Sequence, residues 1–492
     1  MSTPNYGGQP GPNGQFQGQV PAPGPNGQFQ GQVPVPGPNG QFQGQVPAPG
    51  EKKSRGKMAA IISVIVVAIL VVVGGGAFAI SRLGGGGYKS PDALAQSIDS
   101  AFAKNSLVSL AGAASPEELN AATAWQKDYK HNGGTDWSKL MDLKALKDYV
   151  DQIDIKKSEM EYTVDTKSDQ VALITITKWE GDVEIKPELA DKIREHYKEA
   201  KGSDLTANES QAFDKMKQDI QNNPVSSGNV LKNFPNNKLT LVSVKEDGKW
   251  YLSGYMTVAE QFLGTGSAQP NYSANFTDVK GASSPEEAVS GMVDALRNGG
   301  NIGSEDVYRY LDLPERRVAA VYGGGSSSSG YSASGMGGSG VQVTWGLSST
   351  KVSGGAIVNL GTTSITMGEY KVEFNGDSLT VSYPDIDTRT FRTTTKTMTT
   401  NYTEGLVNPE RLGVFTVEDA NGWHVSLVRT IGNLNLLAAS DDAVNQAIDG
   451  LWSATGSHDV DVSKDEMRDL ALNNKPVGAL LVIGWNFAKN MK

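Results

Sequence analysis

The sequence predicts an α+β protein in which one transmembrane helix is followed by two related modules, each with helices first and an antiparallel sheet after them. Three observations predict this fold class. An uncharged apolar stretch near the N-terminus is long enough to span a bilayer. The same helix-start signal occurs at two distant points of the chain, and a β-hairpin pattern with a tryptophan follows each of them.

Composition and charge exclude some functions. The chain has 492 residues, a formal net charge of -10 and no cysteine. Residues 1–57 sum to +3, residues 58–80 carry no charge, and the remainder therefore carries about -13. Such an acidic body repels nucleic acid, so DNA or RNA binding is not expected. Without cysteine, neither thiolate chemistry nor a cysteine metal site is available.

Residues 58–80 form the predicted transmembrane helix. This uncharged segment would rise about 34 Å as a helix, enough for a hydrocarbon core of about 30 Å. The basic stretch Glu51–Lys57 precedes it, and the positive-inside rule therefore places the N-terminus in the cytoplasm and the C-terminus outside. The predicted location is a single-pass cell-membrane protein. The alternative is a signal peptide cleaved at Ala77–Ala79, although its basic region would be unusually long.

Residues 1–57 are predicted to be a disordered cytoplasmic arm. A 13-residue unit rich in Pro, Gly, Asn and Gln occurs three times and carries Phe16, Phe29 and Phe42. Such a composition buries too little apolar surface to offset chain entropy. The spaced aromatics could bind a multivalent partner, or the tail could be a repeat expansion without a specific partner.

The first module is predicted at residues 90–265, after a linker at 81–89. Its opening, Ser90-Pro91-Asp92, combines a helix N-cap, a proline at the first helical position and an acidic first turn. A second short helix begins at Ser115, which forms a capping box with Glu118. A charged helical insert at 187–221, broken near Gly202, interrupts the strands that follow.

The second module is predicted at residues 284–440, after a linker at 266–283. It opens with Ser284-Pro285-Glu286-Glu287, again with a capping box, and a second short helix follows at 304–308. Both modules end in a hairpin pattern, at 239–252 with Trp250 and at 414–425 with Trp423. Agreement at both ends, in the same order, predicts an internal duplication.

Shorter patterns complete the prediction. Strands are expected at 160–177, 341–347, 356–360, 370–374 and 379–383, and an extended segment at 388–402. The C-terminal stretch 441–492 is expected to contain helices at 443–452 and after Ser463, and then a strand at 477–485. This stretch either completes the second module or forms a small extension.

Helices followed by an antiparallel sheet with the hairpin Glu246-Asp247-Gly248-Lys249-Trp250 resemble the NTF2-like (cystatin-like α+β) family. The opening of the second module is similar to the first helix of many such domains. The resemblance implies a curved sheet wrapped on a long helix, with a pocket in the resulting cone. The family includes isomerases, dehydratases and non-catalytic binding modules. The anchored arrangement with its Pro/Gly/Gln-rich arm also looks like envelope proteins of actinobacteria.

A search for chemistry finds no catalytic motif. The four histidines are His131, His196, His424 and His458, and none has metal-ligand spacing. His196 is expected on a solvated helix face, and His424 in a strand, with a pocket-lining role as the alternative. A calcium loop starting at Asp459 lacks the required glycine and the closing glutamate.

The Asp/His pair that NTF2-like enzymes use cannot be placed on this sequence. The long Gly/Ser run at 323–340 reads as a loop, because it lacks the lysine of a phosphate-binding loop. The sequence therefore predicts no catalytic, cofactor-binding or metal-binding residue and no cofactor.

The function expected from these features is that of a non-catalytic, membrane-anchored envelope protein whose modules bind a protein partner or an envelope ligand. The expected partners are the bilayer, through residues 58–80, and an envelope protein. One alternative is a carrier with a pocket for a small apolar molecule or a lipid. The other is an NTF2-like enzyme, which would need buried titratable residues converging in a pocket.

Overall fold

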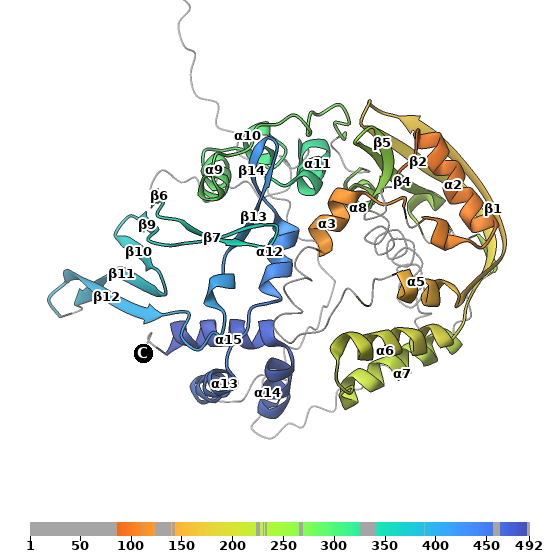
Figure 1. Cartoon of the computed structure of the whole chain (residues 1–492). Coiled ribbons are helices and arrows are strands. Elements are labelled where there is room, and N and C mark those ends of the chain that lie inside the picture. The colour runs from red at the N-terminus through yellow and green to blue at the C-terminus, as the bar shows by residue number, and fades with distance from the viewer. Residues whose placement is uncertain are drawn as a thin grey trace, which may run out of the picture. The chain divides into compact units, whose positions relative to one another are not determined.

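The computed structural model of the chain describes most of the sequence after residue 85 (Figure 1). The described residues are 86–110, 112–123, 139, 143–222, 227–229, 231, 234–264, 269–324, 341–387, 389–455 and 463–489. The predicted disordered arm at 1–57 and most of the predicted linker at 81–89 lie outside them, as does most of the Gly/Ser run at 323–340.

The first module begins with helices and continues with a sheet. Its elements are α2 (Pro91–Ala103), η1 (Leu107–Leu110), α3 (Pro116–Thr123), α5 (Leu143–Val150), β1 (Ile153–Thr166), β2 (Val171–Ile185), α6 (Glu188–Lys201), α7 (Ala207–Asn222), β3 (Ser227–Asn229), η5 (Pro235–Asn237), β4 (Leu239–Glu246), β5 (Lys249–Ser253) and α8 (Gly254–Leu263).

The sheet of this module has the strand order β1-β2-β4-β5 with antiparallel pairing, and β3 pairs with β2 at the side. Helix α2 packs on β1 and β2, as Figure 1 shows. The core between them contains Leu94, Ile98 and Phe102 from α2, and the Phe102 ring meets Trp179 edge-on at 4.7 Å. The helix therefore occupies the inner side of the sheet with its own apolar stripe.

The second module has more strands. Its elements are α9 (Pro285–Arg297), α10 (Glu305–Tyr308), α11 (Leu313–Tyr322), β6 (Val341–Thr344), β7 (Ser348–Val352), β8 (Gly355–Asn359), β9 (Ser364–Met367), β10 (Tyr370–Asn375), β11 (Ser378–Asp387), β12 (Arg392–Asn401), η8 (Pro409–Arg411), β13 (Val414–Asp419), β14 (Gly422–Val425) and α12 (Leu427–Leu434). They form two sheets, ordered β14-β13-β8-β7 and β12-β11-β10-β9-β6.

The two modules share one frame. Strands β1, β2, β4 and β5 correspond in order and direction to β7, β8, β13 and β14. Tyr88 and Ala282 each bridge antiparallel to the hairpin tryptophan, Trp250 or Trp423. Ala114 forms a parallel bridge with Leu252, and Leu311 forms one with Val425; each partner lies two residues after the hairpin tryptophan. These matched bridges place α2 with α9, α3 with α11, and α8 with α12.

The modules differ in what connects their second and third frame strands. In the first module this connection holds the helical pair α6–α7 and the short strand β3. In the second module it holds β9 to β12, which with β6 make the five-stranded sheet. We call this sheet the added sheet, because the frame has no counterpart for it.

The two modules pack together through corresponding helices. Helix α3 contacts α12, and α8 contacts α11, so each module offers the same pair of helices to the other. A buried cluster joins Val242 and Met256 of the first module to Leu311 and Val321 of the second. Phe276, which lies in the predicted linker 266–283, is only 1% exposed and belongs to the same cluster.

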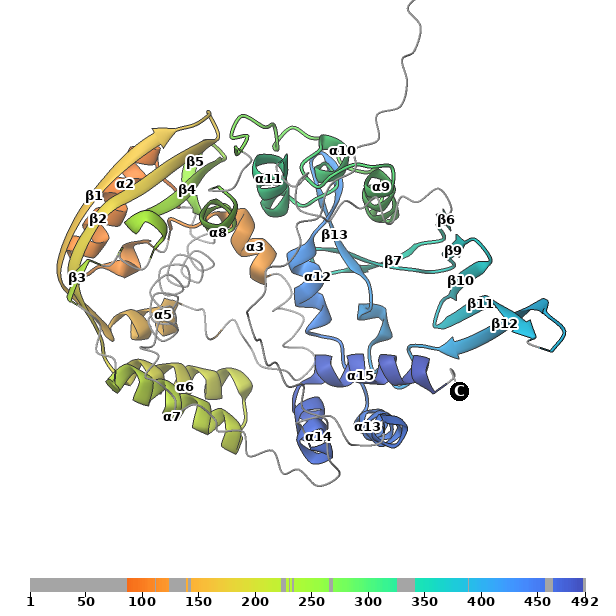
Figure 2. The same cartoon turned by 180° about the vertical axis from the view of Figure 1, so that it is seen from behind.

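The C-terminal stretch folds into three mutually packed helices, α13 (Asp441–Thr455), α14 (Lys464–Asn473) and α15 (Lys475–Ala488), visible from behind in Figure 2. Helix α14 has the predicted capping box of Ser463 and Glu466. The strand predicted at 477–485 is wrong, because these residues lie in α15. Asn474 caps this helix and Pro476 occupies its first turn, so the local start signals favour a helix over a strand.

The predicted fold class is contradicted in its membrane part. In the described residues no helix is both long and apolar enough to cross a membrane. The longest, α7, has 16 residues, whereas spanning a bilayer takes about 20. The stretch 58–80, where the transmembrane helix was predicted, lies outside the described residues. The fold class is corrected to α+β with several antiparallel sheets.

Candidate functional site

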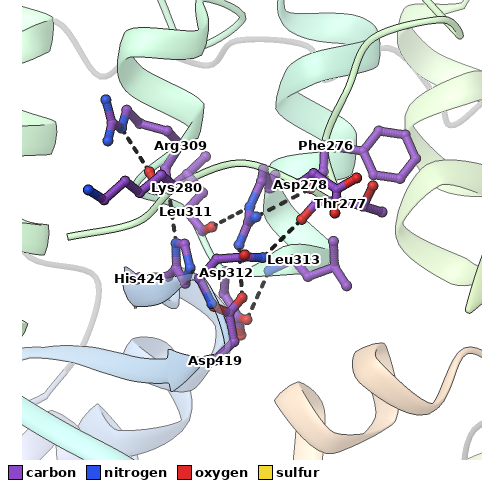
Figure 3. Close-up of polar contacts among 12 residues, drawn as sticks. Phe276, Thr277, Asp278, Lys280, Arg309, Leu311, Asp312, Leu313, Asp419 and His424 are labelled. Atoms are coloured by element: carbon purple, nitrogen blue, oxygen red, sulfur yellow. Dashed lines mark hydrogen bonds and ion pairs between the residues drawn. The ribbon is translucent and has the colours of Figure 1, made fainter. Parts of the chain in front are cut away.

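His424 belongs to a polar cluster of the second module (Figure 3). It stands on β14, is fully buried, and has partners on both ring nitrogens. Nδ1 is 3.0 Å from the carbonyl oxygen of Arg309, and Nε2 is 3.0 Å from Oδ1 of Asp419. A carbonyl oxygen and a carboxylate oxygen are both hydrogen-bond acceptors, so each ring nitrogen of His424 faces an acceptor.

Arg316, on α11, shares the Asp419 carboxylate with His424. Its Nε donates to the carbonyl of Leu311 at 2.9 Å, and one terminal nitrogen lies 3.5 Å from Oδ2 of Asp419. Burial raises the pKa of Asp419, but the hydrogen bond and charge of His424, together with Arg316, outweigh it and hold that pKa below its usual range. The Asp419 carboxylate therefore lies between the His424 ring and the Arg316 guanidinium and contacts both.

This cluster also fastens the segment that joins the modules. Arg316 donates to the carbonyl of Phe276 at 3.3 Å, and Arg309 donates to that of Lys280 at 3.0 Å. Asn421 donates to the carbonyl of Thr277 at 3.2 Å. Since His424 has no exposed surface and both its nitrogens are engaged, the cluster is suited to holding the segment in place and not to transferring protons.

The other histidines give no catalytic arrangement in the described residues. His196 was predicted on a solvated face, and this is wrong: it is 2% exposed, with Nε2 3.0 Å from Oδ2 of Asp148. Helix α5 packs on α6 at this point and covers the ring. His131, His458 and the first positions of the calcium loop tested from Asp459 lie outside the described residues.

A second polar cluster lies where the modules meet, and a glutamate from each module anchors it. Glu118 of α3 accepts hydrogen bonds from Ser253, from the Gly254 backbone at 2.7 Å and from the Tyr255 backbone at 3.2 Å. The predicted capping box with Ser115 is therefore only half formed. Glu118 caps the start of α8 instead of its own helix, because that start offers three donors.

Glu315 of α11 repeats this arrangement in the second module. It accepts from the Ser426 hydroxyl at 3.3 Å and from the Val428 backbone at 3.0 Å, at the start of α12. Burial, as the largest cause, raises the pKa of each glutamate to about 7, against the hydrogen bonds that lower it. Nearby Asp312 raises the pKa of Glu315 further.

Two arginines offset the carboxylates at this junction. Arg317 is completely buried and donates to Glu246 of the first module at 2.6 Å, and Glu246 also accepts from Ser115 at 2.5 Å. Arg429 of α12 lies 3.6 Å from Oδ2 of Asp312. An ion pair across a buried interface aligns the two partners, since either charge alone would be unpaired in an apolar setting.

The added sheet has one apolar face, which differs from these polar clusters. The register places one row of side chains across all five strands: Val343, Ile365, Val372, Val381 and Met398. Cross-strand neighbours point to the same side of a sheet, and residues two apart on one strand do so as well. The same face therefore also carries Val341, Met367, Tyr370, Phe374, Leu379 and Tyr383. We call this set the apolar face.

The opposite face of the same strands is polar. The residues that alternate with the apolar ones are Gln342, Thr344, Ser364, Thr366, Lys371, Glu373, Thr380, Ser382, Thr397 and Thr399. Strict alternation of this kind is typical of a sheet with one covered and one solvated side.

The apolar face is only partly covered: its central row is half-buried, and some of its other side chains are exposed. None of its side chains belongs to a buried core cluster of the described residues. Met367 is 56% exposed and Tyr370 is 51% exposed. The base of the sheet is covered: Leu379 is 6% exposed there, and the Thr400 hydroxyl donates to the carbonyl of Asn486 in α15 at 2.6 Å.

Comparison with known proteins returns no match among family models, curated proteins or solved structures. The resemblance to the NTF2-like family therefore stays a prediction, and the function has to be argued from the geometry.

Sequence reasoning listed two of the clustered residues, His196 and His424, but it missed their partners. Asp148 and Asp419 lie 48 and 5 residues away along the chain. The second pair could have been found, because hairpin register brings a residue before the turn next to one after it. The apolar face was also missed, although its alternation is visible in 341–344 and 379–383.

Proposed function

We propose that this chain is a non-catalytic binding protein that holds another protein chain on the apolar face of the added sheet. The observation that carries the proposal is the row of Val343, Ile365, Val372, Val381 and Met398, aligned across five strands and outside the cores of the described residues. Burying such a row stabilises a complex by about 25 cal/mol for each Å² of apolar surface removed from water.

The arrangement of the polar clusters supports a binding function over an enzymatic one. His424, Arg316 and Arg317 are at most 1% exposed, and each contacts partners within the protein. Acid–base catalysis needs a group that can reach a substrate proton. These groups instead tie together helices and strands of the frame and the segment that joins the modules.

Packing in the first module supports a binding protein over a carrier. Inside its sheet, where the NTF2-like resemblance implies a pocket, Phe102 packs on Trp179, and both are buried. These aromatic side chains belong to the close-packed core of the module and occupy the place where a ligand would bind.

Photocrosslinking in the source cells tests the proposal. p-Benzoylphenylalanine replaces Val372, at the centre of the apolar face, or its neighbour Glu373, which points to the polar face. We expect a covalent adduct with a protein chain from position 372 and little or none from position 373. No adduct from position 372, or equal adducts from both positions, would contradict the proposed function.

A carboxylate introduced on the apolar face should weaken binding, and the same carboxylate on the polar face serves as the control. Val381→Asp puts a carboxylate in the middle of the row, and Ser382→Asp puts the same charge on the polar face one residue later. We expect Val381→Asp to reduce the adduct from position 372 at least about tenfold, since burying an unpaired charge costs several kcal/mol. Ser382→Asp should leave the adduct unchanged. Circular dichroism and melting temperature confirm that both variants fold.

A further inference from the structure

The dimensions of the apolar face narrow the range of partners that fit it. Five strands about 4.8 Å apart give a width of about 24 Å, and six residues along β10 give a length of about 20 Å. A single α-helix, about 10 Å across, would cover less than half of that width. A second sheet of the same width would cover all of it.

The composition of the face also suits packing against another sheet. Its central row is formed mostly by valine and isoleucine, as in the interior of a sandwich of two sheets. Two sheets with the same twist pack face to face with their strands about 30° apart. A copy of the same sheet meets this condition automatically, because its twist is identical.

The charges at the rim allow the face to meet itself. Lys396 on the edge strand β12 and Asp385 on the neighbouring strand β11 form an ion pair of 2.9 Å, and both lie on the side of Tyr383. In a two-fold arrangement such a rim places a cation opposite an anion of the other copy. A rim of one sign would repel its own copy, and this rim carries both signs.

We infer that the partner held on the apolar face is a second copy of this chain, packed sheet on sheet about a two-fold axis. This inference rests on the proposed function and names the occupant of that same surface. The face offers about 500 Å² per copy, or about 1,000 Å² in total, which is the lower limit for a specific interface. The dimer therefore forms and dissociates readily with concentration.

Co-purification of two full-length copies with different tags, produced together, tests the inference. We expect the wild-type copies to be recovered with each other. Val381→Asp in both copies should lower this recovery at least about tenfold, because two carboxylates then face one another in the interface. Ser382→Asp in both copies should leave the recovery as in the wild type.

Three results would overturn the inference. They are no recovery between wild-type copies, recovery that Val381→Asp does not change, and equal loss with both variants. The photocrosslinking experiment separates this failure from failure of the proposed function. An adduct from position 372 with a different protein keeps the function and rejects the second copy, whereas an adduct of two chains of 52.2 kDa supports both.

Discussion

The two modules share a frame of four strands and three helices, but they differ in the segments that connect these frame elements. In the first module the connection between the second and third frame strands is helical and charged, and in the second it is a sheet with an apolar face. Bridges, caps and the hairpin tryptophan are kept in both. The comparison shows which contacts both modules keep and in which connection they differ.

Where the modules meet, two equivalent positions carry different residues in the two modules. The first module has Ser115 and Met256 where the second has Asp312 and Arg429. Met256 is completely buried in the apolar cluster, and Arg429 and Asp312 are 5% and 7% exposed. A neutral pair in one module is therefore replaced by an ion pair in the other.

The largest expected effect comes from breaking that ion pair. Arg429→Met gives the second module the methionine of the first but leaves Asp312 buried without its cation, and we expect a loss of about 3–5 kcal/mol in unfolding free energy. Asp312→Ser in the same chain restores the neutral pair and should recover most of the loss. Urea unfolding measures both. If the double variant is no better than the single one, the two positions are not equivalent.

The next effect depends on pH and concerns Glu118 and Glu315. Each has a folded pKa of about 7 against an ordinary value of 4.5, so the folded state binds more protons between these values. The stabilisation that each protonated glutamate adds to the unfolding free energy is therefore complete below pH 4.5. It is lost as pH rises through 7, which lowers the unfolding free energy by about 3 kcal/mol for each group.

Glutamine, which mimics the protonated acid, should remove this slope. Unfolding free energy measured between pH 5 and 8 is expected to fall less with rising pH in Glu118→Gln and in Glu315→Gln than in the wild type. Glu410→Gln, at an exposed position, should keep the wild-type slope. Unchanged slopes in both glutamine variants of the junction would contradict the burial argument.

The smallest expected effect concerns a glycine that both modules keep. A Cβ on Gly281 would lie 2.5 Å from the His424 ring, and one on Gly87 would lie 2.5 Å from the Tyr251 ring. We expect Gly281→Ala and Gly87→Ala each to cost about 1–3 kcal/mol through overpacking. Gly87 has φ of +81°, which adds backbone strain to that variant.

Gly484→Ala is the control for these variants. This glycine lies on the exposed side of α15, where no atom comes within 4 Å of a Cβ, and alanine there should stabilise the helix by up to about 1 kcal/mol. Thermal unfolding of the three variants measures the difference. Similar melting temperatures for Gly281→Ala and Gly484→Ala would show that the ring can move aside.

Local patterns were enough to predict the elements that local chemistry specifies. The hairpins with Trp250 and Trp423, the helix starts at Ser90 and Ser284, and the break at Gly202 are all found where the sequence placed them. Each depends on contacts between residues only a few positions apart. Strands β7 and β9 were missed because they are short and mostly polar or exposed.

What could not be predicted depends on contacts that are distant in sequence. Glu118 has a residue suited to a capping box in its own helix, but the donors of α8, more than 130 residues later, bind it instead. His196 is buried because another helix covers it. In α15 the apolar run Val477–Trp485 has no clear period, so only the cap at Asn474 and the proline after it indicated a helix.

The shared position of the helical pair and the added sheet has a practical consequence for engineering. Two unrelated structures, α6–α7 and β9–β12, begin and end at the same pair of frame strands, and the strand order of the frame is the same in both modules. The connection between the second and third frame strands therefore accepts inserted segments whose ends lie close together. A fluorescent reporter inserted into this connection of the first module would label the protein and leave the apolar face of the second module unchanged.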